Sequence, residues 1–592
     1  MPTNTDEKPF SQTWLLPLLR LRVWISEVAR PSETQITLFW AGVIGFVGAL
    51  SSIAFRRLTQ VAHWLFTQHT GGYVDTFSHL PAWQRLIVPA AGGLLAGLTI
   101  LFGARLVQKS STDYMEAIVL GDGVISSRSS LVKCFSALFS IASGASIGRE
   151  GPLVQLSAMF ASLIGRVRKT TTLDLRLLVA CGASAGIASA YNAPIGGALF
   201  VAEIILRSLA MESFGPLVFS SVVSTLTVRQ LLGGNPLYEI EVPSVRLQSN
   251  WEIILYLLLG LLTGLAAPWF LRSLRWSERG FSKLPLPIYG RLALGGLCVG
   301  ALAIARPEVC GNGYSVINAI LHGKFFWQIL LLVLIAKLLA TCATFGSGAV
   351  GGVFTPTLFV GACLGYLFES AAGAVWPGEA LVPGAFTLVG MGAFLAATTH
   401  APLMAILILF EMTLDYQIIL PLMLACVVAH YTSSAFKKDS IYSESLKRKG
   451  AGTFQQNLAA MRVSALMKPN PIAVPETAGF TEIADSFVRN RFNYLYVVDE
   501  NRAFRGVVSL HDVKSYLNEP ELAGVVIARD IMLEKFPTIT PEKSLAEALE
   551  QFSLYDNERL PVIESQNGQR LIGSISKRDL LLALAEQAKT QR

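Results

Sequence analysis

Cysteine and charge are both scarce in this chain. Seven of its 592 residues are cysteines, all of them precede residue 437, and none belongs to a C-x-x-C pair. We therefore expect the cysteines to be small packing residues, without disulfide or metal-binding roles. Only 15% of the residues are charged, whereas 52% are hydrophobic, and the mean hydropathy is +0.49. This composition predicts a polytopic membrane protein with room for a soluble domain.

The modest net charge of +7 is not organised for nucleic-acid binding. Basic clusters such as Lys437-Lys438 and 447–449 flank apolar segments, where they help to set membrane topology. We therefore expect the lipid bilayer as a partner and no nucleic acid. Residues 1–35 carry a short apolar patch among acidic and basic residues, which argues against a cleaved signal peptide and favours a cytoplasmic or interfacial segment.

Charge is almost absent between Cys134 and Gly165, where Arg149 and Glu150 are the only charged residues. An ionisable group at bilayer depth costs several kcal/mol, so such a residue is a functional candidate. Pro152 favours the first turn of a helix beginning there, and the free N–H groups of a helix N-terminus bind anions. The sequence therefore predicts an anion site inside the membrane, with the Glu150 carboxylate as a built-in competitor for it.

The same pattern occurs twice. Residues 143–152 (SGASIGREGP) are matched 204 positions later by residues 347–356 (SGAVGGVFTP), and residues 192–203 are matched by residues 400–411. Two halves with Gly/Pro-broken helices at corresponding positions are typical of a transport site at a repeat interface. Long apolar runs such as Ile36–Phe55 and Leu131–Ile147 complete the membrane domain. We place this domain at residues 36–436 and expect its two halves to be inverted repeats.

The motifs Gly148–Pro152 and Gly352–Pro356 resemble the signature segments of the CLC family of chloride channels and chloride/proton antiporters. This resemblance implies an all-α membrane domain of tilted, partly broken helices, a homodimer with one pore per subunit, and a location in the inner or plasma membrane. It also implies chloride as the transported ion and Glu150 as the gate. A permanent helix cap or a pair with Arg149 is the structural alternative for Glu150. Fluoride-specific relatives are disfavoured because Pro152 is present.

Further chloride ligands follow from the resemblance. The backbone N–H groups of Val353 and Phe354 and the hydroxyl of Tyr442 are expected at the anion, although an aromatic at either position could serve packing alone. The family's usual G-S-G-I-P loop is absent at the expected spacing, where this chain has residues 110–116 (SSTDYME). Ser111 or Thr112 is the candidate hydroxyl there, and anion selectivity is left open.

Proton coupling depends on a position next to Glu203. In the antiporters of the family a second glutamate relays protons one residue later, but Ile204 occupies that place here. Glu203 itself is the remaining relay candidate, and its match with Glu411 favours a structural role. A passive, voltage-gated channel and a chloride/proton antiporter therefore both remain open.

The composition changes after Phe436. Residues 437–462 form a charged linker, and 463–520 and 528–585 repeat strand and helix patterns that resemble a tandem pair of CBS domains. Their S-x-x-D signatures supply Ser509 with Asp512 and Ser576 with Asp579 as candidates for adenine-nucleotide binding, while a structural lid without ligand is the alternative. We expect this α/β pair to be cytoplasmic and regulatory. We expect no enzyme, metal or required cofactor, and the rival function is a membrane-anchored nucleotide sensor.

Overall fold

The structure is a computed structural model that describes residues 33–105, 113–119, 121–168, 170–234, 238, 251–375, 382–437, 439–446, 461–489, 494–510, 513, 526–534, 536–555, 558–564 and 569–580. The chain divides into two compact units, Met1–Ser445 and Leu446–Arg592. The all-α membrane domain followed by a small α/β domain, as predicted, is confirmed.

Eight helices of the described part are long and apolar enough to cross a membrane. They are α2 (Glu33–Thr67), α4 (Ala82–Ala104), α10 (Met211–Leu232), α11 (Trp251–Ser282), α12 (Ile288–Ala305), α14 (Trp327–Gly346), α15 (Phe354–Val375) and α18 (Ile419–Phe436). A helix pairs its backbone groups internally, as the hydrocarbon core of a bilayer requires, although internal prolines such as Pro89 of α4 and Pro216 of α10 each lack an N–H donor.

Ten further α-helices of the described residues complete the membrane unit. They are α3 (Tyr73–His79), α5 (Tyr114–Val119), α6 (Ser127–Ala142), α7 (Glu150–Val167), α8 (Thr172–Tyr191), α9 (Pro194–Leu199), α13 (Tyr314–Leu321), α16 (Ala385–Thr399), α17 (Pro402–Thr413) and α19 (Ile441–Leu446). A π-helix, Phe200–Leu206, continues α9, and 3-10 turns occupy Pro307–Val309 and Tyr416–Ile418. Proline begins both α9 and α17, where its missing N–H removes no helical hydrogen bond.

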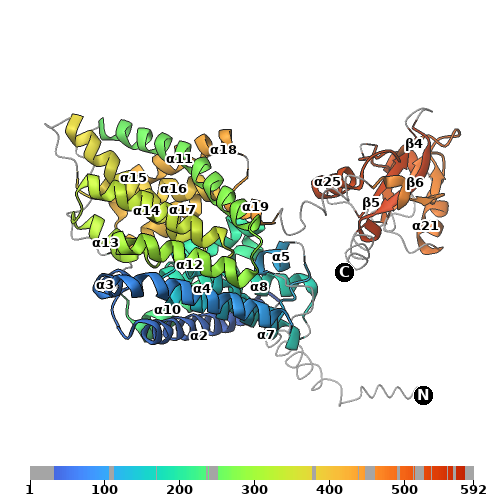
Figure 1. Ribbon diagram of the computed structural model, residues 1–592. Helices are drawn as coiled ribbons and strands as arrows, with labels where there is room; N and C mark the ends of the chain where they lie inside the picture. The colour runs from blue at the N-terminus through green and yellow to red at the C-terminus, as the bar shows by residue number, and fades with distance from the viewer. Residues whose placement is uncertain are drawn as a thin grey trace, which may run out of the picture. The chain divides into compact units, whose positions relative to one another are not determined.

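The two repeats meet along α4 and α12, which lie side by side in Figure 1. Glycine makes this close approach possible. A Cβ atom added to Gly93 would lie 2.3 Å from the carbonyl oxygen of Leu292, and one added to Gly296 would lie 2.1 Å from that of Pro89. Small residues that let two backbones touch are a common means of helix association in membranes.

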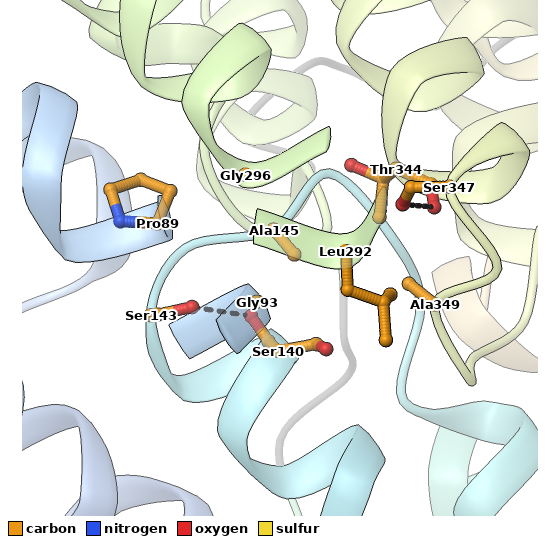
Figure 2. A pocket seen from close by; sticks show the side chains of 10 residues that line it. All are labelled: Pro89, Gly93, Ser140, Ser143, Ala145, Leu292, Gly296, Thr344, Ser347 and Ala349. Carbon is orange, nitrogen blue, oxygen red and sulfur yellow. Dashed lines mark hydrogen bonds between the residues drawn. The ribbon is translucent and has the colours of Figure 1, made fainter. Parts of the chain in front are cut away.

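A small cavity directly beside this crossing shows the internal symmetry (Figure 2). Its ten lining residues form five pairs separated by 203 or 204 positions along the chain. The pairs are Pro89 with Leu292, Gly93 with Gly296, Ser140 with Thr344, Ser143 with Ser347, and Ala145 with Ala349. Equivalent residues of the two repeats therefore line the cavity. Among them are residues of the Ser-Gly-Ala turns that precede both signature loops.

The described residues of the second unit form two three-stranded sheets. One has the order β2 (Ala473–Pro475), β3 (Tyr494–Val498), β4 (Phe504–Ser509), and the other has β1 (Lys468–Pro469), β6 (Leu571–Ser576), β5 (Arg559–Ile563). Helices α21 (Phe480–Arg489), α24 (Ala528–Ile531) and α25 (Leu545–Tyr555) accompany the sheets. Because β1 pairs with β6, a strand from the start of the unit completes the sheet at its end.

The two sheets share a core. Tyr496, Val498, Phe504 and Val507 of the first sheet pack in one cluster with Ile563 and Leu571 of the second. Each repeat also has a cluster of its own, centred on Leu495 and Val497 in the first and on Leu560 and Val562 in the second. The tandem repeat predicted from the sequence is thus a single packed unit.

Candidate anion site

The two signature loops touch in the middle of the membrane unit. Gly148 N–H donates to the carbonyl of Gly352 over 2.8 Å, and Gly352 N–H donates to the carbonyl of Gly148 over 2.9 Å. Helix α7 begins two residues after Gly148, and α15 begins two residues after Gly352. The N-termini of two helices, one from each repeat, therefore flank the bridge, and their free N–H groups give a positive potential at this point.

The Glu150 carboxylate lies in this bridge and is buried. The Thr355 hydroxyl donates a hydrogen bond to Glu150 Oε1. A Cβ atom on Gly148 would lie 1.9 Å from Glu150 Oε2, and one on Gly352 would lie 2.7 Å from the same oxygen. The carboxylate thus occupies space that only glycine leaves open on either side.

Aromatic side chains connect this carboxylate to Tyr442. The ring of Phe354 lies 4.8 Å from that of Tyr191, and Phe200 meets the ring of Tyr442 edge-on at 5.4 Å. Phe200 also contacts Phe354, with ring centroids 6.5 Å apart. The structure therefore brings Glu150, Val353, Phe354 and Tyr442 into one continuous cluster.

Three members of this cluster were missed by sequence reasoning: Thr355, Tyr191 and Phe200. The Tyr191 hydroxyl lies 3.3 Å from Thr355 Oγ1, so two neutral hydroxyls gather beside the carboxylate. Thr355 stands between Phe354 and Pro356 in the signature motif, and Tyr191 directly precedes the repeated Asn192 motif. Their positions inside repeated motifs were the available signal, but a threonine and a tyrosine carry no distinctive chemistry of their own.

Arg149 does not neutralise its neighbour. Its guanidinium carbon lies 5.7 Å from the ring centroid of Tyr314, and no ion pair joins it to Glu150 within the described chain. The Tyr314 hydroxyl is 3.5 Å from Thr355 Oγ1. The positive charge of Arg149 is therefore held against an aromatic face, beside the site and not on the carboxylate.

The first-repeat hydroxyl candidates cannot be placed, because Ser111 and Thr112 lie outside the described residues. The described residues begin again at Asp113, and Tyr114 N–H donates to Gln155 Oε1 of α7 over 3.1 Å. Gln155 Nε2 in turn donates to Ser130 Oγ over 2.9 Å. The segment after the candidates is therefore anchored to the helix that carries Glu150.

Glu203 and Glu411 each cap the N-terminus of a helix in the other repeat. Glu203 accepts hydrogen bonds from the N–H groups of Leu403 (3.2 Å) and Met404 (2.7 Å) at the start of α17. Glu411 accepts them from Ile195 (2.9 Å) and Gly196 (2.7 Å) at the start of α9. Both oxygens of each carboxylate are thus occupied by backbone donors of the other repeat.

Ile204, next to Glu203, is buried and apolar. It lies in the π-helix Phe200–Leu206, whose first residue is the Phe200 that contacts Tyr442. This stretch of the candidate proton path therefore offers no ionisable group other than the Glu203 carboxylate.

In the second unit, Asp579 is held by two groups. Its N–H donates to Ser576 Oγ over 3.0 Å, and Lys468 Nζ lies 2.8 Å from Asp579 Oδ2. The bond from Lys468 lowers the pKa of the Asp579 carboxyl below its usual range. Ser509 lies at the end of β4, where it pairs in register with Tyr494. Asp512 lies outside the described residues.

Across the part of the chain that is described, no group of three or more His, Cys, Asp or Glu side chains could hold a metal ion. The described cysteines form no disulfide.

Comparison with known proteins agrees with this arrangement. The family model described as "Voltage gated chloride channel" matches residues 92–434, and the model described as "CBS domain" matches residues 463–519 and 528–586. The chain is 52% identical over 413 residues to the "Putative chloride channel protein ClcB-like" of Ralstonia nicotianae, covering 69% of this chain and 96% of that relative. It is 41% identical over 411 residues to the "Voltage-gated ClC-type chloride channel ClcB" of Citrobacter koseri, covering 69% and 98%.

Two solved structures are also similar. One is a slow cyanobacterial Cl⁻/H⁺ antiporter, with a TM-score of 0.62, 26% identity, and coverage of 70% of this chain and 97% of that chain. The other is a eukaryotic CLC transporter, with a TM-score of 0.63, 20% identity, and coverage of 92% and 97%. At 20% identity the second supports the fold alone.

Proposed function

Because the chain belongs to the voltage-gated chloride channel family, we propose that it moves chloride across a membrane through the site at which α7 and α15 meet. The observation that carries this proposal is the buried Glu150 carboxylate between two helix N-termini. Groups that bind a carboxylate there, namely backbone N–H groups and neutral hydroxyls, also bind chloride. Transport then requires Glu150 and chloride to replace one another.

Protonation decides this exchange. An ionised Glu150 competes with chloride for the same donors, whereas a protonated Glu150 has no charge and releases them. Chloride movement is therefore sensitive to pH whether or not protons are carried across. Val353, Phe354 and Tyr442 are the further chloride ligands in this proposal, with Ser111 or Thr112 as the contribution of the first repeat.

We further propose that proton coupling is weak or absent. A relay to Glu150 needs an ionisable group that is free to take up a proton, but Ile204 has none and Glu203 is bound to two N–H groups of α17. Passive or loosely coupled chloride movement follows. The rival is antiport, which is the activity named for the cyanobacterial relative.

The deciding experiment places the full chain in liposomes with an outward chloride gradient and records external pH with an electrode. Chloride efflux without stoichiometric proton uptake supports the proposal. Uphill proton transport driven by the chloride gradient contradicts the uncoupled mechanism and supports antiport. Absence of any chloride flux contradicts the transport function itself.

The orientation follows from basic residues. Helix α7 ends at Arg166 and Arg168, and α18 is followed by Lys437. Basic residues at helix ends favour the cytoplasmic side of the inner or plasma membrane. The C-terminal unit follows α18 in the chain, so we assign it to the cytoplasm as well.

We also propose a homodimer. Helices α9 and α17 are too short to cross a membrane, yet Ile195 and Leu403 at their N-termini are 39% and 45% exposed. Broken helices are tolerated at membrane depth where protein, not lipid, covers them. A second copy of the chain is the natural cover for this face, together with the exposed apolar side chains of the neighbouring α10 and α18, such as Phe219 and Val427.

The CBS pair is proposed to bind an adenine nucleotide and to regulate transport. The Ser576 hydroxyl and the Asp579 carboxylate are adjacent, and Lys468 adds a positive charge beside them. A carboxylate suits ribose hydroxyls, and an ammonium suits phosphate. Ser509 and Asp512 supply the equivalent groups of the first repeat.

A further inference from the structure

The second repeated motif, residues 192–203 and 400–411, begins at the C-terminal ends of two helices. The backbone conformation is the same at both ends, but the side chains differ. Asn192 closes α8 with φ 59°, and His400 closes α16 with φ 58°, both in the left-handed conformation. In the first repeat, Arg229 of α10 donates to Asn192 Oδ1 over 2.8 Å and to the Asn192 carbonyl over 3.3 Å. That end of the repeat is fixed by a permanently charged guanidinium.

In the second repeat the corresponding place holds two histidines. The ring of His430, on α18, lies 5.5 Å from that of His400, with the ring planes at 86°. His400 Nε2 and His430 Nδ1 are both buried, and neither has a hydrogen-bond partner among the residues with described side chains. An imidazole is neutral or charged according to pH, with an unperturbed pKa of about 6.5. This pair can therefore change charge where its counterpart cannot.

The surroundings of the pair decide what a proton would do there. Among the described residues, Arg207, Lys437 and Asp439 are charged groups that act on His400 electrostatically. Helix α17 begins at Pro402, two residues after His400, and its positive N-terminus is capped by Glu203. Cys426 and Tyr431 are the other titratable side chains close to His430 on α18, and the Tyr431 ring lies 5.2 Å from that of His430.

The pair also stands close in sequence to the candidate pore tyrosine. Lys437 follows α18 directly, and its ammonium pairs with Glu444 over 2.9 Å. Glu444 also lies 3.4 Å from Arg275 of α11. Tyr442 lies in α19, between Lys437 and Glu444 in the sequence, and its ring packs against that of Phe200. Movement of the end of α18 would therefore move Tyr442.

We propose that His400 and His430 form a pH sensor on the side of the membrane to which the C-terminal unit is attached, and that its protonation slows chloride movement. A proton on either ring adds a cation beside Arg207 and Lys437, opposed by the Asp439 carboxylate and by the Glu203 carboxylate that caps α17, and a proton on both rings makes the two imidazolium groups repel each other. The charged pair separates, the end of α18 moves away from the turn between α16 and α17, and Tyr442 loses its contact with Phe200. This inference rests on the proposed function for its flux readout.

The test uses the full chain in liposomes, in the Glu150→Gln background so that the gate itself no longer titrates, with EDTA present to exclude metal effects. The pH on the side of the C-terminal unit is lowered from about 7.5 to about 5, the range in which imidazoles titrate. We expect chloride efflux to fall several-fold. His400→Asn, which installs the residue of the first repeat, and His430→Gln should each remove that fall, whereas the exposed His79→Gln control keeps it. A fall that persists in both variants, or a rise on acidification, overturns the proposal.

A second measurement is independent of transport. Neutral, buried histidines protonate more readily after unfolding, so acidification should lower the melting temperature of the detergent-solubilised chain over the same pH range. The double variant His400→Asn/His430→Gln should show a smaller drop than the wild type. If chloride flux is absent but this difference is present, the proposed function fails and the titrating pair stands. An identical drop in melting temperature in the wild type and in the double variant contradicts the proposal that this pair titrates.

Discussion

At the scale of single residues, Glu150 is held by groups that bind it without fixing it. Its Oε1 accepts from one threonine hydroxyl, and its neighbours Gly148 and Gly352 have no side chain to trap it. Arg149 is engaged with Tyr314. In the proposed mechanism, a carboxylate in such surroundings leaves the site when it gains a proton.

Glu150→Gln is expected to make chloride flux independent of the pH on the outer side and to abolish any proton movement. The amide has the shape of a protonated carboxyl group and no charge at any pH, so it cannot compete with chloride. Chloride efflux from liposomes at several outer pH values measures the effect, with the inner pH held constant. Wild-type dependence on outer pH in the variant would refute the role of Glu150 as gate.

Thr355→Val is expected to raise chloride flux at neutral pH. Valine keeps the shape of threonine but removes the hydroxyl that donates to Glu150, and a hydrogen bond to a charged group contributes about 1.5–3 kcal/mol, or roughly tenfold or more in occupancy. Thr355→Ser keeps the hydroxyl and is the matched control. Equal flux in the valine and serine variants would show that this contact does not hold the gate closed.

Much of this candidate site could be predicted from the sequence, but contacts between residues far apart in the chain could not. Glu150 and Phe354 were accessible because charge and motif repetition mark them, whereas Tyr442 was accessible only through the resemblance to the family. Thr355 and Tyr191 were not, because their role depends on a contact across 164 positions that no local pattern encodes. The aromatic partner of Arg149, Tyr314, lies 165 positions away and was not predicted either.

At the scale of elements, hydropathy found the spans but misplaced their ends. The apolar run Ile36–Phe55 predicts a helix that stops before Arg56, yet α2 continues to Thr67. The Arg56 guanidinium donates to the carbonyls of Ser189 and Ala190, so the charge is accommodated within the bundle. Conversely, the run Leu131–Ile147 contains the end of α6 at Ala142, because Gly144 adopts φ 94° and turns the chain toward Gly148.

The exchanged caps of α9 and α17 predict how Glu203 behaves. Glu203→Gln is expected to leave chloride flux intact but to lower the melting temperature, because an amide presents one acceptor oxygen where the carboxylate satisfies two N–H groups of α17. Glu411→Gln, at the equivalent cap of α9, is the matched control and should have a similar effect. Loss of proton transport in the Glu203 variant alone would identify Glu203 as a relay.

Helix α25 carries a prediction about pH. Glu547 accepts from Lys543 Nζ (2.5 Å) and from Ser544 N–H (2.9 Å), and these bonds lower the pKa of Glu547 to about 2. A lowered carboxyl pKa stabilises the fold above the unfolded-state value of about 4.3, and this contribution is lost as pH falls toward 2. Glu547→Gln should therefore reduce the melting temperature of isolated 463–585 at pH 7 and reduce it less at pH 3. A difference that does not depend on pH would mean that the charge of Glu547 is not what stabilises α25.

At the scale of the whole molecule, two units with separate cores are joined in one chain, so ligand binding to one can be measured apart from the other. If the CBS pair binds a nucleotide, ATP, ADP or AMP at millimolar concentration should raise the melting temperature of isolated 463–585, because a ligand of the native state stabilises it by mass action. Asp512→Ala with Asp579→Ala should remove the increase. No shift with any of the three nucleotides would leave the pair as a structural lid.

The exchange of caps between repeats has a consequence for how the protein is made. Glu203 and the N–H groups that it caps are separated by 200 or 201 positions, and Glu411 and its partners by 215 or 216. When α9 and the π-helix after it have been synthesised but α17 has not, the Glu203 carboxylate has no N–H groups of α17 to bind. The N-terminus of α9 likewise has no cap from Glu411. Neither defect is repaired until α17 follows. The first repeat therefore cannot reach its final structure before the second repeat has been synthesised as far as α17.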